Sequence, residues 1–157
     1  MANLCNNRLV VSGPEKDIDD FFYRACGQVN DEFQTLLFEN FVPFDKGEWE
    51  HSEAIALWGT KWEPEVHHTA RYESLTYEFD TAWSPPSKWF DSIVDQYPTL
   101  DFHLEWFEPG MGGAGTLEGV NGVSTEETHE PSFDDYESFG IVHPDDFDDE
   151  DDEDDED

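Results

Sequence analysis

Residues 8–26, RLVVSGPEKDIDDFFYRAC, contain the change from strand to helix that decides the fold. Residues 8–12 are rich in β-branched side chains and predict a strand, which the Gly13-Pro14 pair closes. Pro14 suits the first turn of a helix, and the apolar residues that follow have the spacing of one helical face (Ile18, Phe21, Phe22, Ala25 and Cys26). The sequence therefore predicts a helix over about residues 14–26.

Similar signals continue along the chain. Residues 36–42 form an apolar stretch that predicts a strand, and residues 48–58 predict a short helix ended by Gly59. Residues 66–71 and 74–80 predict paired strands. Pro85-Pro86 opens a helix with an apolar face, and Pro98 ends it. Residues 100–107 alternate mainly apolar with mainly charged side chains, which predicts a strand with one charged face.

This order of elements predicts the βαββαβ pattern of a ferredoxin-like α+β sandwich, with helices on one face of an antiparallel sheet and a short helix inserted in the middle. The glycine-rich residues 110–122 contain a possible last short strand, TLEGV at 116–120. The chain has 157 residues, which fits one core, and its 13 Phe, 5 Tyr and 6 Trp can fill that core. We expect one domain over residues 1–123.

Acidic residues greatly exceed basic ones. The chain has 40 Asp and Glu against 7 Lys and Arg, which gives a formal charge of −33 at pH 7. Such a surface repels phosphates, so we expect no direct binding of bare nucleic acid or of an anionic membrane. No apolar run approaches the roughly 18 residues of a membrane span, and the start MANLCNNR lacks the regions of a signal peptide. We expect a soluble protein of the cytoplasm.

The negative charge is concentrated toward the C-terminus. Residues 89–157 carry 24 acidic and no basic side chains, and twelve of the thirteen residues 145–157 are Asp or Glu. Too little apolar surface offsets the ordering entropy there, so residues 145–157 predict a disordered tail. Residues 124–144 are acidic but keep Phe133, Tyr136 and Phe139. They predict a linker that is either a partner-binding stretch or a strand at the edge of the domain.

Five segments carry a resemblance to a known family. They are MANLCNNRLVVSGP (1–14), NFVPF (40–44), WGTKWE (58–63), YEFDTAWSPP (77–86) and LEWFEPGMGGAG (104–115). Over about residues 1–120 the chain resembles the YubB-type ferredoxin-like domain proteins of phages and plasmids. The resemblance implies a ferredoxin-like fold without an iron-sulfur cluster, on a mobile genetic element, and the polyacidic tail departs from it. The motif residues that carry it are Trp58, Gly59, Thr60, Lys61, Trp62, Phe79, Asp80, Thr81, Trp83, Pro85, Phe107, Glu108, Pro109 and Gly110.

Signatures of catalysis, metal binding and cofactor binding are missing from the sequence. There is no P-loop, no GxSxG and no HExxH, and GMGGAG (110–115) lacks the βαβ setting of a dinucleotide-binding turn. His67 and His68 are adjacent in a predicted strand, so we expect them on opposite faces. We expect Cys5 and Cys26 to be two small buried thiols. We therefore predict no catalytic residue, no metal site and no cofactor, and a protein that is not an enzyme.

The polar and aromatic motif residues also have structural interpretations. Asp80, Thr81 and Ser84 lie between a strand and a helix, where their side chains can cap the helix start. Four tryptophans, Trp58, Trp62, Trp83 and Trp106, can pack as one aromatic cluster in the core, whereas an exposed subset would mark a protein-contact patch.

Two functions from different classes fit these patterns best. The first is a DNA mimic, in which an anionic surface binds a basic, nucleic-acid-binding host protein such as a restriction or CRISPR component. The second is a protein-protein adaptor whose acidic tail serves solubility or encounter. Adaptation to high salt is a third explanation of the charge, and an enzyme is the weakest. The predicted partner-binding residues are Asp91, Asp95, Asp101, Glu105, Asp145, Asp146, Asp148, Asp149, Glu150, Asp151, Asp152, Glu153, Asp154, Asp155, Glu156 and Asp157.

Overall fold

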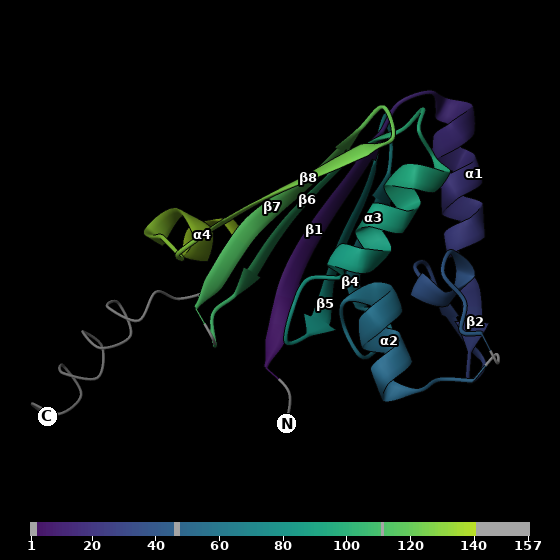
Figure 1. Ribbon diagram of the computed structural model, residues 1–157. Helices are drawn as coiled ribbons and strands as arrows, with labels where there is room; N and C mark the ends of the chain where they lie inside the picture. The colour runs from purple at the N-terminus through teal and green to yellow at the C-terminus, as the bar shows by residue number, and fades with distance from the viewer. Residues whose placement is uncertain (1–2, 46–47, 111, 141–157) are drawn as a thin grey trace, which may run out of the picture.

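The computed structural model describes residues 3–45, 48–110 and 112–140, and it consists of one large antiparallel sheet with helices packed against it (Figure 1). The elements in chain order are β1 (Leu4–Ser12), α1 (Glu15–Ala25), β2 (Gly27–Val29), β3 (Glu32–Gln34), the 3-10 turn η1 (Phe38–Asn40), α2 (His51–Trp58), β4 (Glu65–Arg71), β5 (Leu75–Ala82), α3 (Ser87–Gln96), β6 (Asp101–Glu108), β7 (Gly113–Val120), β8 (Val123–His129) and α4 (Phe133–Ser138).

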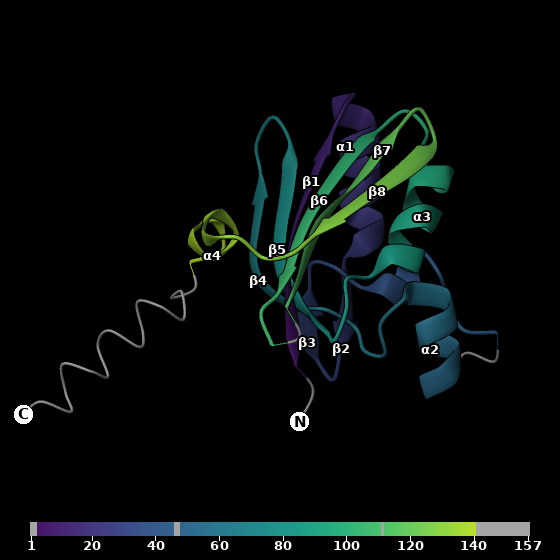
Figure 2. The same cartoon turned by 60° about the vertical axis from the view of Figure 1, so that its left-hand side comes forward.

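The large sheet has six strands in the order β4-β5-β1-β6-β7-β8, and every neighbouring pair is antiparallel. The first four strands in this order, together with α1 and α3, form the predicted βαββαβ core. β7 and β8 extend the sheet beyond β6. Figure 2 shows the six strands side by side. The predicted α+β architecture is therefore confirmed, and the sheet is two strands wider than the basic pattern.

The two faces of the sheet have different surroundings. α1, α2 and α3 lie on one side, and α4 lies on the other (Figure 1). Inward side chains such as Leu9, Phe79 and Leu104 join Phe21 of α1 and Trp89 of α3 in one hydrophobic core. Because strand side chains alternate in direction, the residues between them face away from α1 and α3. We call this second surface of the large sheet the outer face.

The apolar stretch 36–42 is not the strand that its composition predicts. Phe38 to Asn40 form the 3-10 turn η1, and a hairpin of β2 and β3 precedes it. Phe38 packs against Trp58 and Trp89, so the apolar part of the stretch is buried, while Glu39 and Asn40 are exposed. The hairpin turns at Asn30 and Asp31, which both have positive φ, as a type I′ turn requires.

The C-terminal part of the domain extends further than predicted. Residues 123–129 form strand β8, which pairs with β7 along its length. Of the two alternatives for the segment 124–144, the edge strand is therefore correct for its first part, and a domain boundary at residue 123 would separate β8 from its sheet. α4 and Phe139 follow on the outer face, whereas the predicted tail, residues 145–157, lies outside the described residues.

None of the helices in the described parts of the chain is long and apolar enough to cross a membrane.

A glycine in β7 allows α3 to approach the sheet closely. A Cβ atom added to Gly119 would meet Val94 Cγ2 of α3 at 2.2 Å, well inside contact distance. We predict that Gly119→Ala lowers the free energy of unfolding by about 1–3 kcal/mol, because the added methyl overpacks this junction. Urea denaturation measures the effect.

The double variant Gly119→Ala/Val94→Ala is the control for this clash. It should lose less stability than the sum of the two single variants, because Val94→Ala removes the atom that the new methyl meets. A Gly119→Ala protein as stable as the wild type would show that α3 does not pack as described.

Candidate functional site

The outer face carries a set of carboxylates from all the strands of the large sheet except β1. The register of the strand pairs places these side chains on the same side as Arg8 of β1. Together they form what we call the acidic face: Glu65, Glu78, Asp80, Asp101, Glu105, Glu118 and Glu127. Arg8 is the one Lys or Arg among the described strand residues that point to this side.

Arg8 lies between two of these carboxylates. It stands directly opposite Glu78 on β5 and Glu105 on β6, and its guanidinium approaches them to 3.5 and 3.9 Å. The arginine also donates to the Ser138 backbone oxygen at 2.9 Å and lies 5.0 Å from the centre of the Phe139 ring. The positive charge of Arg8 is therefore compensated within the chain.

α4 and Phe139 cover part of the outer face over the end of β6. Phe107 points outward from β6, and its ring packs against the rings of Tyr136 and Phe139 at 4.7 and 6.0 Å between centroids. A capping box between Ser132 and Asp135 holds the start of the helix. α4 adds Asp134, Asp135 and Glu137 to the side of the molecule that already bears the acidic face.

Histidines stand among the carboxylates of the acidic face. His67 Nε2 lies 2.7 Å from Asp80 Oδ2, and His103 Nδ1 lies 3.2 Å from Glu118 Oε1. The hydrogen bond to Asp80 raises the pKa of His67. Protonation of His67 reduces the negative charge of this face.

The expectation that His67 and His68 point to opposite faces is wrong. The register shifts between Val66 and His68, so β4 has a bulge there. His68 stands opposite the outward Glu78, while His67 bonds to the outward Asp80. An extra residue in one strand breaks the alternation, which places both rings on the outer face. Within the described residues, no three His, Cys, Asp or Glu side chains form a group that could hold a metal ion.

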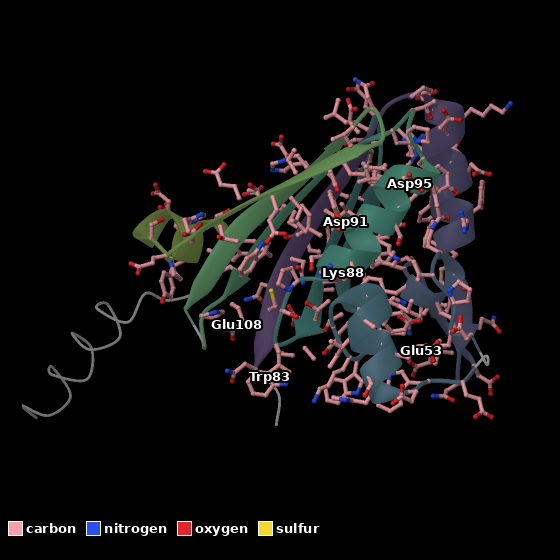
Figure 3. The ribbon with its side chains drawn as sticks, in the orientation of Figure 1. Glu53, Trp83, Lys88, Asp91, Asp95 and Glu108 are labelled. Atoms are coloured by element: carbon pink, nitrogen blue, oxygen red, sulfur yellow. The ribbon has the colours of Figure 1, made fainter. Side chains whose placement is uncertain are left out.

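The four acids predicted on the last helix and strand do not form one surface. Asp101 and Glu105 lie on the acidic face, on either side of His103 along β6. Asp91 and Asp95 belong to α3, on the helix-covered side of the sheet (Figure 3). Asp91 there accepts a hydrogen bond from Ser124 of β8 at 2.8 Å. The other predicted partner-binding acids, Asp145, Asp146 and residues 148–157, lie outside the described residues.

Sequence reasoning missed most of the acidic face. Glu78 and Asp80 alternate with apolar residues in the predicted strand 74–80, so their common direction could have been read from the sequence. Glu118 and Glu127 could not, because their strands lack a clear apolar alternation. Arg8 gives no sequence signal for its position between Glu78 and Glu105, since the strand pairing decides it.

Several of the motif residues meet at one end of the sheet, where a polar network joins α2 to the end of β5. Thr60 Oγ1 donates to the Ala82 oxygen at 2.8 Å, and Ser84 Oγ donates to the Gly59 oxygen at 2.6 Å. Gly59 ends α2 with φ of 87°, a conformation that favours glycine. Figure 3 shows Trp83 and Glu108 toward this end. These contacts connect two segments of the motif, WGTKW and DTAWSPP.

The predicted capping role of Asp80, Thr81 and Ser84 is wrong. Asp80 and Thr81 lie within β5, and α3 begins after Pro86 without a side-chain cap. The buried Thr81 instead accepts a hydrogen bond from Asn7 at 3.0 Å and donates to the Ser84 oxygen at 2.6 Å. The polar side chains thus fix the turn from strand to helix from inside the fold.

Trp83 is held in an unusual backbone conformation at this end. Its φ is 71°, and Ser84 N donates to the Ala82 oxygen at 2.9 Å, which closes a three-residue turn around the tryptophan. Such turns are rare and strained, and strained residues concentrate at functional sites. The Trp83 side chain is 45% exposed, and it borders a pocket of about 200 Å³ with Ile55 and Thr60.

The four tryptophans do not form one cluster. Trp58 is buried and packs against Phe38 and Phe44 in the core. Trp106 lies on the helix-covered side of β6, next to the glycines of β7. Trp62 and Trp83 are about half exposed. The exposed pair therefore fits the alternative interpretation, a protein-contact patch.

The fold and this surface define an anionic α+β sandwich with one largely open sheet face. The family model described as "Ferredoxin-like domain in Api92-like protein" matches residues 57–155, more than half of the chain. The chain belongs to this family. The ferredoxin-like fold implied by the resemblance is thereby confirmed, whereas the YubB-type name is not.

A solved structure is similar as well. It is the crystal structure of protein api92 from Yersinia pseudotuberculosis, which aligns with a TM-score of 0.57 at 10% identity and covers 84% of this chain and 100% of its own. At this identity the similarity concerns the fold alone. The comparison with curated proteins gave no match.

The hydrogen bond between His67 and Asp80 yields a prediction about pH. In Asp80→Asn the pKa of His67 should fall toward its ordinary value of 6.5, because the bonded carboxylate is lost. A pKa raised in the folded state stabilises the protein fully below about pH 6.5 and ceases to do so as the pH rises through the folded value. The variant should therefore lose more stability at pH 5.5 than at pH 9, by less than about 1 kcal/mol because the His67 ring is half exposed.

NMR titration of the imidazole protons and urea denaturation at the two pH values measure these effects. His68→Gln is the matched control and should leave the pKa of His67 raised. An unchanged pKa of His67 in Asp80→Asn would rule out the hydrogen bond as its cause.

Proposed function

We propose that this chain is a non-enzymatic protein that binds a basic, nucleic-acid-binding host protein in place of DNA. The observation that carries the proposal is the acidic face, where seven carboxylates surround a single arginine that Glu78 and Glu105 already pair. Such a surface offers a partner fixed negative charges and, among the strand residues that the structure describes, no free Lys or Arg that would repel a basic groove.

The strand register sets the spacing of these charges. Glu78, Glu105 and Glu127 lie in one row across the sheet, with Arg8 and Thr116 between them. Neighbouring strands lie about 4.8 Å apart, so the carboxylates in this row stand about 10 Å apart. The other four carboxylates lie in neighbouring rows, and the proposed attraction of a basic groove rests on the sum of these charges over the face.

Most of the described basic residues lie away from the acidic face. Lys16 and Arg24 lie on α1, Lys88 lies on α3, and Arg71 points inward from β4 to pair with Asp19 of α1 at 3.0 Å. Carboxylates also occur on the helical side, but there these bases accompany them. A basic partner is thus drawn toward the acidic face, most strongly at low salt.

The resemblance to the YubB-type proteins adds a cellular setting to this proposal. A YubB-type protein of a phage or plasmid would act in the cytoplasm of the host cell, and its natural targets would be restriction, CRISPR or other DNA-handling proteins. The acidic residues 145–157 would extend the anionic surface. No direct contact with nucleic acid or membrane belongs to this function.

A protein-protein adaptor is the alternative, and one observation favours it. Trp83, which the strained turn presents to solvent, lies beside a small pocket, and Trp62 is also exposed. Exposed tryptophans are typical of the centres of protein interfaces. An adaptor of this kind would hold a non-basic partner by apolar contact, in a manner that salt does not weaken.

Two triple variants with equal net charge separate these functions. Asp101→Asn/Glu118→Gln/Glu127→Gln removes three charges from the acidic face, and the control Asp91→Asn/Asp95→Asn/Glu126→Gln removes three from the helix-covered side. Each variant protein is immobilised and exposed to bacterial lysate at about 50 mM salt, where charges attract over a longer range, and at about 500 mM salt, where they are strongly screened. The first variant should lose basic DNA-binding proteins that the wild type and the control retain at low salt.

Displacement completes this test. Double-stranded DNA added to the loaded wild type should release the captured basic proteins, because both ligands would occupy the same groove. Recovery of one non-basic protein that resists both high salt and DNA, equally from all three proteins, would favour the adaptor and contradict the mimic.

Truncation after Pro144 tests the contribution of residues 145–157. We predict that the shortened chain binds the same basic partner with lower affinity and with a smaller dependence of affinity on salt, because twelve of the thirteen removed residues are acidic. Calorimetry over a series of salt concentrations measures both quantities. An unchanged complex would assign binding to the folded domain alone.

A further inference from the structure

A pocket of about 360 Å³ lies where β4 begins, between that strand and the β2–β3 hairpin. Val29, Leu37, Pro64 and Val66 supply its apolar lining. This volume falls within the range of small-ligand sites. Nothing in the function proposed above makes use of it.

Two acidic residues, Glu63 and Glu65, line the pocket, and their carboxylates are held differently. Glu63 is held in place, because its two oxygens accept hydrogen bonds from Phe38 N at 2.5 Å and from Glu39 N at 3.1 Å. Glu65 is exposed, and it stands opposite Asp80 on the acidic face. The pocket therefore continues the acidic face around the edge of β4.

The lining indicates the chemistry of a ligand. Apolar walls favour an alkyl chain, and two carboxylates favour a cationic end. No Lys or Arg lines the pocket, so an anionic ligand would find no counter-charge. Burial also raises the pKa of Glu63 to about 7, against the effect of its two backbone hydrogen bonds, as expected for a carboxylate whose charge is incompletely compensated.

We propose that this pocket receives an alkyl cation, namely a lysine side chain that the basic partner presents when it covers the acidic face. The methylene groups of the lysine contact Val29, Leu37 and Val66, and the ammonium group lies between Glu63 and Glu65. The nature of the ligand follows from the pocket itself, whereas the source of the lysine rests on the proposed function.

A small probe tests the pocket without a partner protein. n-Pentylammonium is titrated into the full chain at pH 8, and n-pentanol serves as the neutral probe of the same length. NMR shifts should appear at Val29, Leu37 and Val66, and the amine should bind about tenfold more tightly than the alcohol, as a charge-assisted hydrogen bond provides. Equal binding of the two probes, or shifts confined to other residues, would overturn the proposal.

Variants locate the site. Glu65→Gln should weaken amine binding about threefold or more, whereas Glu78→Gln, which removes an equal charge from the acidic face outside the pocket, should leave it within twofold. Val29→Phe narrows the entrance without altering charge and should abolish binding. Since Glu63→Gln also disturbs the 3-10 turn, it is judged only after its spectrum shows an intact fold. Unchanged binding in both Glu65→Gln and Val29→Phe would refute the assignment.

The two proposals fail in different ways. If octalysine binds the wild type and is lost in the acidic-face triple variant, while n-pentylammonium does not bind the pocket, then the pocket proposal is wrong and the mimic stands. If the amine binds the pocket but no basic protein is captured at low salt, then the pocket is a cation site and the proposed function is wrong.

Discussion

The pairing of Arg8 with both Glu78 and Glu105 is the interaction on which the outer face depends. The three side chains occupy directly opposite positions on β5, β1 and β6, at the centre of the sheet. Opposite charges on neighbouring strands stabilise a sheet by about 0.2–1 kcal/mol for each pair, and like charges destabilise it by similar amounts. An uncharged residue at position 8 would leave Glu78 and Glu105 to repel each other across β1. The same guanidinium holds the end of α4, so the arginine links the acidic face to the C-terminal segment.

Alternation along the strands explains why the sequence predicted the fold well and the site only in part. β5 and β6 have a clear apolar face, so their direction and their charged side could be read from residues 74–80 and 100–107. β8 has no apolar face, because nearly all of its side chains are exposed and its backbone pairing with β7 holds it in place. Hydrophobic periodicity cannot detect such a strand. The prediction for residues 36–42 is wrong for another reason, since the buried apolar residues on either side of the exposed Glu39 and Asn40 fit a 3-10 turn as well as a strand.

Acidic residues that are close in sequence lie on opposite sides of the sheet. Asp91 and Asp95 precede Asp101 and Glu105 by only a few residues, yet the chain passes from α3 to β6 between them. The helix lies on one side of the sheet, and the outward positions of the strand point to the other. The strained turn at Trp83 could not be predicted from the sequence, because tryptophan has no preference for positive φ and the turn is held by contacts with distant residues, among them Asn3 and Gly59.

The proposed function explains the placement of the described basic residues, which general acidity does not. Arg24 donates to the Asn40 oxygen and stacks over Phe41, Arg71 pairs with α1, and Lys61 lies over Trp62. These cations support packing on the helical side or at the end of the sheet. On the acidic face, Arg8 is the one Lys or Arg of the described strand residues, and it pairs with Glu78 and Glu105. Solubility or tolerance of high salt requires an excess of acids but no such division of the bases between two sides. A surface that must accept a basic groove does require it, because one free cation at its centre would meet the lysines and arginines of the partner at short range, where salt screens least.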